Sequence, residues 1–534
     1  MTITTPSRPE TSSGSGQRHL GWALVLISVA QLMVVLDATI ANIALPFIKS
    51  DLGIAQANLS WIVTGYALAF GGLLLLGGRL GDLYGRRRML MVGVSIFAVA
   101  SLLGGLASSE GLLLGARGLQ GLGAAIASPA ALALITTTFP AGPQRNRAFS
   151  VYAAMSGAGA AVGLILGGWL TGLEPTLLGH VVDGWRLTFL INVPIGLAAA
   201  VAAPLLLSES ESHPGELDLP GALSGTLGLV GVVYGLTRAG NRLYGWSDPW
   251  TIASLVAGVA LLVTFAGIER RVSHPLLPVR ILANRTRATS FVVMMLVPAA
   301  MFSMFYFLSL FVQNVMGFSP LRTGVAFLPF SAGIVLGASV SSKLIEKVDP
   351  RWIAGVGTAM AGAALFGFSR LPYDDRIGHL AINAHYSSNL LPYIVLMSVG
   401  MGLTFVPLTL TAVHGVGDRD SGIGSGVLNT MQQVGGALGL ATLSTVAVHF
   451  TQDKATSLGA AAQAAASQGG TSAGPDKLHA LQQLIAQVAY TEGATHAFLT
   501  GAGMIWLGTL IALVFLNARH QDLATDEAPE GVGV

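Results

Sequence analysis

The sequence contains no cysteine, which excludes disulfide bonds, thiolate metal sites and cysteine nucleophiles. It is also poor in charge, because only 10% of its 534 residues are Asp, Glu, Lys or Arg, whereas soluble proteins carry about 25%. Hydrophobic residues make up 52% of the chain. So few charges cannot cover the surface of a soluble protein of this size, and we therefore expect most of the surface to face lipid.

Motifs for ATP binding and for zinc-dependent hydrolysis are missing as well. The chain has no Gly-Lys dipeptide, and therefore no P-loop, and it contains no HExxH motif. We predict a protein that is not an enzyme and that uses no cofactor and no metal. The net charge is only +2 and the basic residues are scattered over short loops, so nucleic acid is not an expected partner.

Fourteen apolar runs are long enough to cross a bilayer, which needs about 20 residues of helix. They begin near Leu20, Trp61, Met89, Leu112, Ala148, Leu187, Leu219, Ile252, Thr289, Gly324, Ile353, Leu390, Ser421 and Ala497. An even number of spans places both termini on one side of the membrane. About twice as many of the 28 Lys and Arg residues would lie on that side as on the other, so the positive-inside rule predicts cytoplasmic termini.

Two segments of the chain repeat in its second half. Ser342, Leu344, Glu346, Asp349 and Arg351 stand at the spacing of Gly78, Leu80, Asp82, Gly85 and Arg87. Gly159 and Gly163 in the fifth span are matched by Gly435 and Gly439 in the thirteenth. We therefore predict an all-α polytopic protein in which two six-helix bundles form a parallel repeat, with a central cavity between them and two extra helices inserted.

The expected boundaries follow from the spans and the composition. Residues 1–18 are predicted to be a disordered tail, 19–207 the first bundle, 208–288 a linker with the two inserted helices, 289–516 the second bundle, and 517–534 a second tail. The second bundle includes a long outside loop, 449–495, in which a short amphipathic helix is expected because leucines recur at helical spacing from Leu478.

Asp37 is the most informative residue, because a carboxylate inside an apolar span costs several kcal/mol unless it is paired, hydrated or protonated. Arg117 is the basic residue that lies well inside a span, at nearly the same depth as Asp37, given a rise of about 1.5 Å per residue. We predict that Asp37 takes up and releases a proton, and that Arg117 faces Asp37 or its hydrogen-bonding neighbours in one conformation and leaves in another, which determines when the carboxylate can accept that proton. The alternatives are a packing carboxylate satisfied by Thr39, and an arginine that reaches to the outer interface.

The loop 78–88 is expected to control conformation. Gly78 and Gly85 permit close approach of the backbone. Asp82 could pair with an arginine or a helix N-terminus across the interface between the halves, which would form a latch with Arg86, Arg87 and the related Glu346. The alternative is a simple anchor of positive charge on the cytoplasmic side.

Polar and aromatic residues inside the spans are candidates for the wall of a substrate cavity. Each could equally form hydrogen bonds between helices. The candidates are Gln31, Trp61, Tyr66, Gln120, Asn192, Gln313, Asn429 and Gln433.

The segments 36–46, 78–88, 117–121, 185–196 and 424–430 together resemble the major facilitator superfamily, and in particular its fourteen-span drug:proton antiporters. The resemblance implies twelve core helices plus two, no cofactor, and proton coupling at the positions of Asp37 and Arg117. It also implies conformational change at Asp82 and the loop arginines. The fifth span departs from that family's pattern, since it has Gly163-Leu164 where such antiporters usually have Gly-Pro, so no proline kink is expected there.

The predicted function is proton-driven efflux of amphipathic drugs, antibiotics or related metabolites across a bacterial plasma membrane. The predicted partners are the lipid bilayer, protons and the small substrate, with the protein acting as a monomer. Two alternatives remain at this point. One is a proton-linked importer or a lipid or metabolite transporter of the same fold, and the other is a membrane sensor that does not transport.

Overall fold

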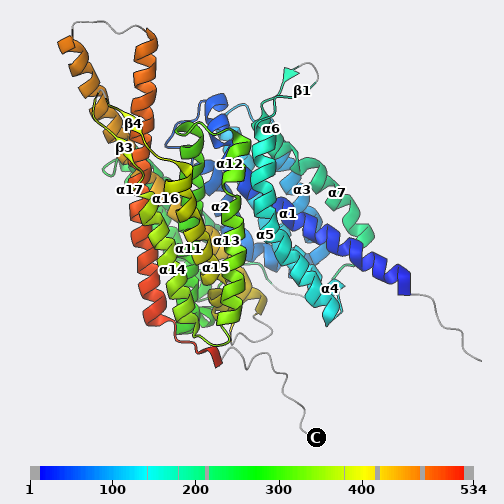
Figure 1. Cartoon of the computed structure of the whole chain (residues 1–534). Helices are drawn as coiled ribbons and strands as arrows, with labels where there is room; N and C mark the ends of the chain where they lie inside the picture. Colours follow the sequence, from blue (N-terminus) through cyan, green and yellow to red (C-terminus); the bar gives the residue numbers. More distant parts are fainter. Residues whose placement is uncertain are drawn as a thin grey trace, which may run out of the picture.

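The computed structural model describes residues 13–140, 142–177, 180–210, 216–377, 379–414, 421–469 and 475–521. It is almost entirely helical (Figure 1). Two short antiparallel hairpins, β1 (Thr176–Leu177) with β2 (His180–Val181) and β3 (Tyr373–Asp374) with β4 (Ala381–Ile382), lie in loops. Within this part of the chain the all-α prediction is confirmed.

The helices form two bundles and an inserted pair. The first bundle holds α1 (Ser13–Leu52), α2 (Trp61–Tyr84), α3 (Arg86–Gly105), α4 (Glu110–Thr138), α5 (Pro143–Thr171), α6 (Gly184–Leu190) and α7 (Asn192–Leu206). The inserted pair is α8 (Leu219–Ala239) and α9 (Pro249–Glu269), followed by the short α10 (Val279–Ala283). The second bundle holds α11 (Arg285–Asn314), α12 (Pro320–Ala326), α13 (Leu328–Leu344), α14 (Pro350–Phe368), η1 (Tyr386–Leu390), α15 (Leu391–Val413), α16 (Ser421–Gly469) and α17 (Pro475–Phe515).

Each predicted span start falls in or beside one of these helices. Twelve helical segments of the described chain are long and apolar enough to cross a membrane. The predicted fifth and eleventh spans correspond to α5 and α14, which are 29 and 19 residues long and are not among those twelve. The architecture of two bundles plus extra helices fits the chain, and the count of fourteen spans stays a prediction.

The two bundles repeat the same packing. In the first bundle α5 packs on α1, where a Cβ added to Gly163 would lie 2.0 Å from Thr39 Oγ1. In the second bundle α16 packs on α11 in the same way, and a Cβ added to Gly439 would lie 2.1 Å from Ala299 Cβ. Only glycine permits helix backbones to approach so closely. The repeated glycine spacing in the sequence therefore corresponds to equivalent helix contacts in the two halves.

We call the ends of the spans that face the predicted cytoplasm the inner ends, and the opposite ends the outer ends. Several contacts between the bundles lie toward the outer ends. Ser309 of α11 donates to Asn42 O at 3.0 Å, and Gln313 donates to Ile43 O at 3.2 Å. Gly168 of α5 lies directly against Pro320 at the start of α12. The structure thus holds the outer ends of the two bundles together.

Two details differ from the expected boundaries. The helix α1 begins at Ser13, inside the predicted disordered tail, while residues 1–12 lie outside the described part. The predicted outside loop 449–495 is largely helical, because α16 runs on to Gly469 and α17 begins at Pro475 (Figure 1). Alanine and glutamine, which are frequent there, favour helix, and this propensity extends the spans beyond the membrane.

Candidate functional site

A polar cluster lies inside the first bundle, where five helices meet. Asp37 comes from α1, Tyr66 from α2, Ser101 from α3, Arg117 and Gln120 from α4, and Asn192 from the start of α7. Glycines of α4 allow this approach. A Cβ added to Gly121 would lie 2.6 Å from Tyr66 O, and one added to Gly123 would lie 2.7 Å from Phe97 N. The backbone of α4 therefore packs directly on α2 and α3 and carries Arg117 into the bundle.

Asp37 and Arg117 form an ion pair at the centre of this cluster. Arg117 Nη1 donates to Asp37 Oδ2 at 2.5 Å. Both residues are buried, with exposed fractions of 3% for Asp37 and 1% for Arg117. The arginine therefore does not reach to the outer interface, and the alternative in which it does so is wrong for this structure. The predicted proximity of the two charges is confirmed.

The remaining hydrogen-bonding capacity of the pair is also used. Gln120 Nε2 and Asn192 Nδ2 donate to Asp37 Oδ1 at 2.8 and 3.2 Å. Arg117 donates to Ile62 O at 2.8 Å and to Gln120 Oε1 at 2.9 Å, and its guanidinium lies 4.4 Å from the centre of the Tyr66 ring. These contacts compensate for the loss of water around two buried charges.

One acceptor beside the carboxylate has no donor. Asn192 Oδ1 is buried and finds no hydrogen-bond partner within the described residues, although the Nδ2 of the same amide binds Asp37. A carboxylic acid, unlike a carboxylate, carries one O–H donor. A proton on Asp37 could therefore be accommodated by rotation of the Asn192 amide, which would offer its oxygen in place of its nitrogen.

The loop 78–88 lies at the inner end of the first bundle. Asp82 pairs with Arg86 in the same loop, at 3.3 Å. Arg87 and Arg88 instead pair with Glu209 of the linker, at 3.5 and 3.6 Å, and Glu209 also accepts hydrogen bonds from their backbone N–H groups. Within the described chain, Asp82 has no partner on the second bundle and Glu346 is exposed. The latch between the halves stays a prediction for another conformation.

Gly85 has a structural reason to be glycine. Its φ of +96° is a conformation that residues with a Cβ rarely adopt. A Cβ there would also lie 2.5 Å from Glu209 Oε1. The loop therefore fits against the linker only because Gly85 has no side chain, whereas Gly78 has room for a Cβ at 3.7 Å from its nearest neighbour, Pro129.

The predicted cavity residues divide into three groups. Tyr66, Gln120 and Asn192 belong to the buried cluster and are at most 3% exposed, so they do not line an open cavity in this structure. Trp61 packs against Tyr234 of α8, with ring centres 6.4 Å apart, and Gln313 lies in the outer contact between the bundles.

The other three predicted cavity residues remain accessible. Gln31 is partly buried and accepts hydrogen bonds from Tyr152 and Ser128, at 2.8 and 3.3 Å. Asn429 is exposed, and Gln433 lies against Gly71 of α2. These three positions agree with a cavity wall, and the assignment stays a prediction.

Sequence reasoning missed Ser101 and Glu209. Ser101 accepts a hydrogen bond from Gln120 at 2.8 Å and is fully buried. No sequence signal distinguishes it, since a single serine is common in an apolar span. Glu209 stands in the acidic linker that follows the sixth span, opposite in charge to the three loop arginines, and that complementarity was a usable signal.

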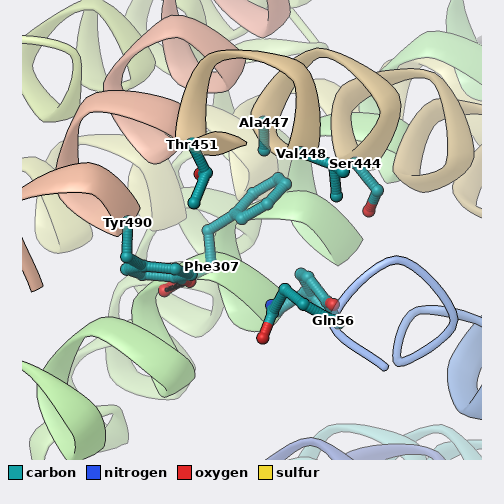
Figure 2. Close-up of a pocket in the computed structure, with 8 residues that line it drawn as sticks. Gln56, Phe307, Ser444, Ala447, Val448, Thr451 and Tyr490 are labelled. Atoms are coloured by element: carbon teal, nitrogen blue, oxygen red, sulfur yellow. Dashed lines mark hydrogen bonds between the residues drawn. The ribbon is translucent and has the colours of Figure 1, made fainter. Parts of the chain in front are cut away.

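A separate small pocket opens near the outer ends (Figure 2). Gln56, Phe307, Thr451 and Tyr490 are among the residues that line it, and they come from the loop before α2 and from α11, α16 and α17. None of the predicted site residues lines this pocket.

Comparison with known proteins agrees with this geometry. Residues 27–440 match the family model described as Major Facilitator Superfamily. The chain is 44% identical over 433 residues to the puromycin resistance protein of Streptomyces alboniger, covering 80% of this chain and 82% of the relative. It is 37% identical over 429 residues to the cephamycin export protein of Amycolatopsis lactamdurans, covering 79% and 84%.

A third relative and a solved structure complete the comparison. The tetracenomycin C resistance and export protein of Streptomyces glaucescens is 34% identical over 441 residues, covering 82% of this chain and 78% of the relative. A crystal structure of a bacterial homologue of the human lysosomal transporter Spinster, inward-facing and unoccupied, superposes with a TM-score of 0.67. It covers 96% of this chain and 99% of its own at 17% identity, and therefore shows the shared fold alone.

Proposed function

Because the chain belongs to the Major Facilitator Superfamily, we propose that it exports amphipathic antibiotics from a bacterial cytoplasm in exchange for protons. It is a multi-pass plasma membrane transporter and not an enzyme. The relatives named for puromycin resistance and for cephamycin export support efflux over import. Puromycin-like amphipathic compounds are therefore the first substrates to test.

The observation that carries the proton coupling is the buried pair of Asp37 and Arg117. A proton that binds Asp37 removes the negative charge and leaves the guanidinium with Ile62 O, Gln120 Oε1 and the Tyr66 ring. The attraction between α1 and α4 then falls, and the packing of these helices is free to change. Release of the proton on the other side restores the pair, so occupancy by H⁺ and helix packing are linked.

Alternating access follows from the arrangement of the bundles. With termini in the cytoplasm, as the positive-inside rule predicts, the closed outer ends correspond to a conformation open to the inside. Opening to the outside requires that Ser309 and Gln313 leave the backbone of α1. In this conformation Asp82 pairs with Arg86, and we expect it to pair with the second bundle in the opposite conformation.

The decisive experiment replaces Asp37 by Asn, which keeps the shape of the side chain and one acceptor oxygen but cannot ionise. In inverted membrane vesicles with an imposed proton gradient, we expect Asp37→Asn to insert normally but to lose puromycin accumulation. Asp374→Asn, which removes a partly buried carboxylate from the β3 hairpin, is the matched control. Wild-type accumulation by the Asp37 variant would disprove proton coupling at this pair, and accumulation of the opposite sign would favour an importer.

A further inference from the structure

The inserted helix α8 contacts both bundles, but it contacts them in different ways. Along α2 the contact runs for most of the length of the membrane. At the inner side Ala222 packs with Leu76, in the middle a Cβ on Gly72 would meet Thr226, and at the outer side Tyr234 lies against Trp61. The contact with α2 therefore ties α8 to the first bundle at every depth.

The linker before α8 strengthens this attachment. Glu209 binds the backbone N–H groups of Arg87 and Arg88 at 3.0 and 3.2 Å, and Ser210 accepts from the N–H of Arg86 at 2.9 Å. These N–H groups begin the helix α3 and have no acceptor within their own helix. A negative carboxylate at a helix N-terminus is also favoured by the helix dipole. The segment that leads into α8 is thus fixed to the first bundle.

Among the described residues, the contacts shown between α8 and the second bundle lie in the outer half. Val233 packs with Ala437 and Ala441 of α16, and Thr445 Oγ1 donates to Leu236 O at 2.7 Å. A Cβ added to Gly240 would lie 2.8 Å from the Cα of Thr445. The backbones of α8 and α16 therefore touch where the outer ends of the bundles are closed.

The loop after α8 extends this contact beyond the membrane. The Arg242 side chain pairs with Asp453 at 2.5 Å and donates to Thr456 Oγ1 at 2.9 Å. Its backbone N–H donates to Gln452 Oε1 at 3.2 Å. These partners lie on the outer extension of α16. That extension is in turn held to the second bundle, since Lys454 pairs with Asp375 beside the β3 hairpin at 2.5 Å.

We propose that these contacts form an outer clasp, made by Leu236, Gly240 and Arg242 on one side and by α16 residues 445–456 on the other. The clasp holds the conformation with closed outer ends, and it opens when the transporter faces outward. The ion pair of the clasp is weak, since the side chains of Arg242 and Asp453 are 49% and 39% exposed and exposed ion pairs contribute little. We expect the longer contact with α2 to persist, so that α8 travels with the first bundle. This inference rests on the proposed alternation between two conformations.

The absence of cysteine permits a direct test with two engineered disulfides. Gly240→Cys with Thr445→Cys joins α8 to the second bundle across the clasp, and Gly72→Cys with Thr226→Cys joins it to the first. Both sites bring side chains close enough for a disulfide, which needs a Cβ–Cβ distance of about 3.5–4.5 Å after small adjustment. We expect oxidation to lower puromycin accumulation at least tenfold in the first variant, with recovery on reduction, and to change it less than twofold in the second.

A second measurement does not depend on transport and keeps the inference testable if a disulfide variant fails to fold. A single cysteine at Ser309, buried in the closed outer contact, is labelled by a membrane-impermeant maleimide added from outside. We expect Arg242→Gln to raise the labelling rate at least threefold. Arg376→Gln, which breaks an exposed pair with Asp374 away from α8, is the control and should leave the rate unchanged.

The outcomes separate the clasp from the proposed function. Full transport by the oxidised Gly240–Thr445 pair, arrest by both disulfides, or unchanged labelling in Arg242→Gln would each overturn the clasp. Absence of puromycin accumulation in the unmodified protein would count against the proposed substrate, while the labelling experiment would still decide the clasp.

Discussion

The sharpest energetic prediction concerns Arg117. Replacement by Met keeps an unbranched side chain of similar length but removes the charge, and so leaves the carboxylate of Asp37 buried with only the Gln120 and Asn192 amides as donors. Removing one partner of a buried ion pair costs about 3–5 kcal/mol. The folded to unfolded ratio should therefore fall by more than about a hundredfold.

A double-mutant cycle tests whether this cost comes from the unpaired charge. Asp37→Asn combined with Arg117→Met removes both charges, so the double variant should be more stable than the sum of the single changes predicts. We expect a coupling of about 2–3 kcal/mol, which is the upper range for residues in direct contact. The assay is reversible chemical unfolding of the purified protein in detergent, followed by tryptophan fluorescence.

A second cycle with the same residue types supplies the control. Asp374 and Arg376 form a pair on the predicted outer surface, where the arginine side chain is 76% exposed. Their coupling should stay below about 1 kcal/mol, as for other exposed pairs. If the Asp37 and Arg117 changes proved additive, or coupled no more strongly than the surface pair, the two charges would not depend on each other and the reasoning from burial would be refuted.

Two further predictions follow from packing and from charge. Gly163→Ala should lower stability and transport together, because the new Cβ would lie 2.0 Å from Thr39 Oγ1. Gly118→Ala, whose new Cβ would have no atom within 4 Å, should be neutral. Thermal unfolding of both variants checks this, and an unchanged unfolding midpoint for Gly163→Ala would contradict the contact. At the outer surface, the hydrogen bond from Lys454 holds the pKa of the Asp375 carboxyl below its ordinary value of 3.8. A carboxyl whose pKa is lowered in the folded state contributes stability that is present above pH 3.8 and is lost as the pH falls through the lowered pKa. Asp375→Asn should therefore reduce the loss of stability at acid pH. Identical profiles of stability against pH for the variant and the unmodified protein would rule this out.

Much of the fold could be predicted from the sequence, because bilayer thickness and hydropathy determine where helices begin and end. The depth of Asp37 and Arg117 was equally accessible, since a regular rise per residue places both at one level. The rotation of each helix about its own axis could not be predicted. Trp61 and Gln120 looked like cavity residues because they lie in spans, yet one faces α8 and the other the buried pair.

Contacts between distant segments also escaped prediction. Glu209 contacts loop arginines that lie about 120 residues earlier in the chain, and no local sequence pattern predicts that contact. The polar composition of the outer extension of α16 and α17 predicts a loop, although polarity indicates only that the segment leaves the membrane. Helix propensity of its alanines would have given the right answer there.

The matched glycine contacts of the two bundles bear on how such a transporter can diversify. Where α5 meets α1 and α16 meets α11, the glycine backbones of α5 and α16 pack directly against atoms of the facing helix, and a Cβ at Gly163 or Gly439 would overlap them. Substitution there disturbs the scaffold at once. We therefore expect substitutions that broaden or shift the range of exported compounds to occur on other faces of these helices, while the glycine contacts within each bundle are retained.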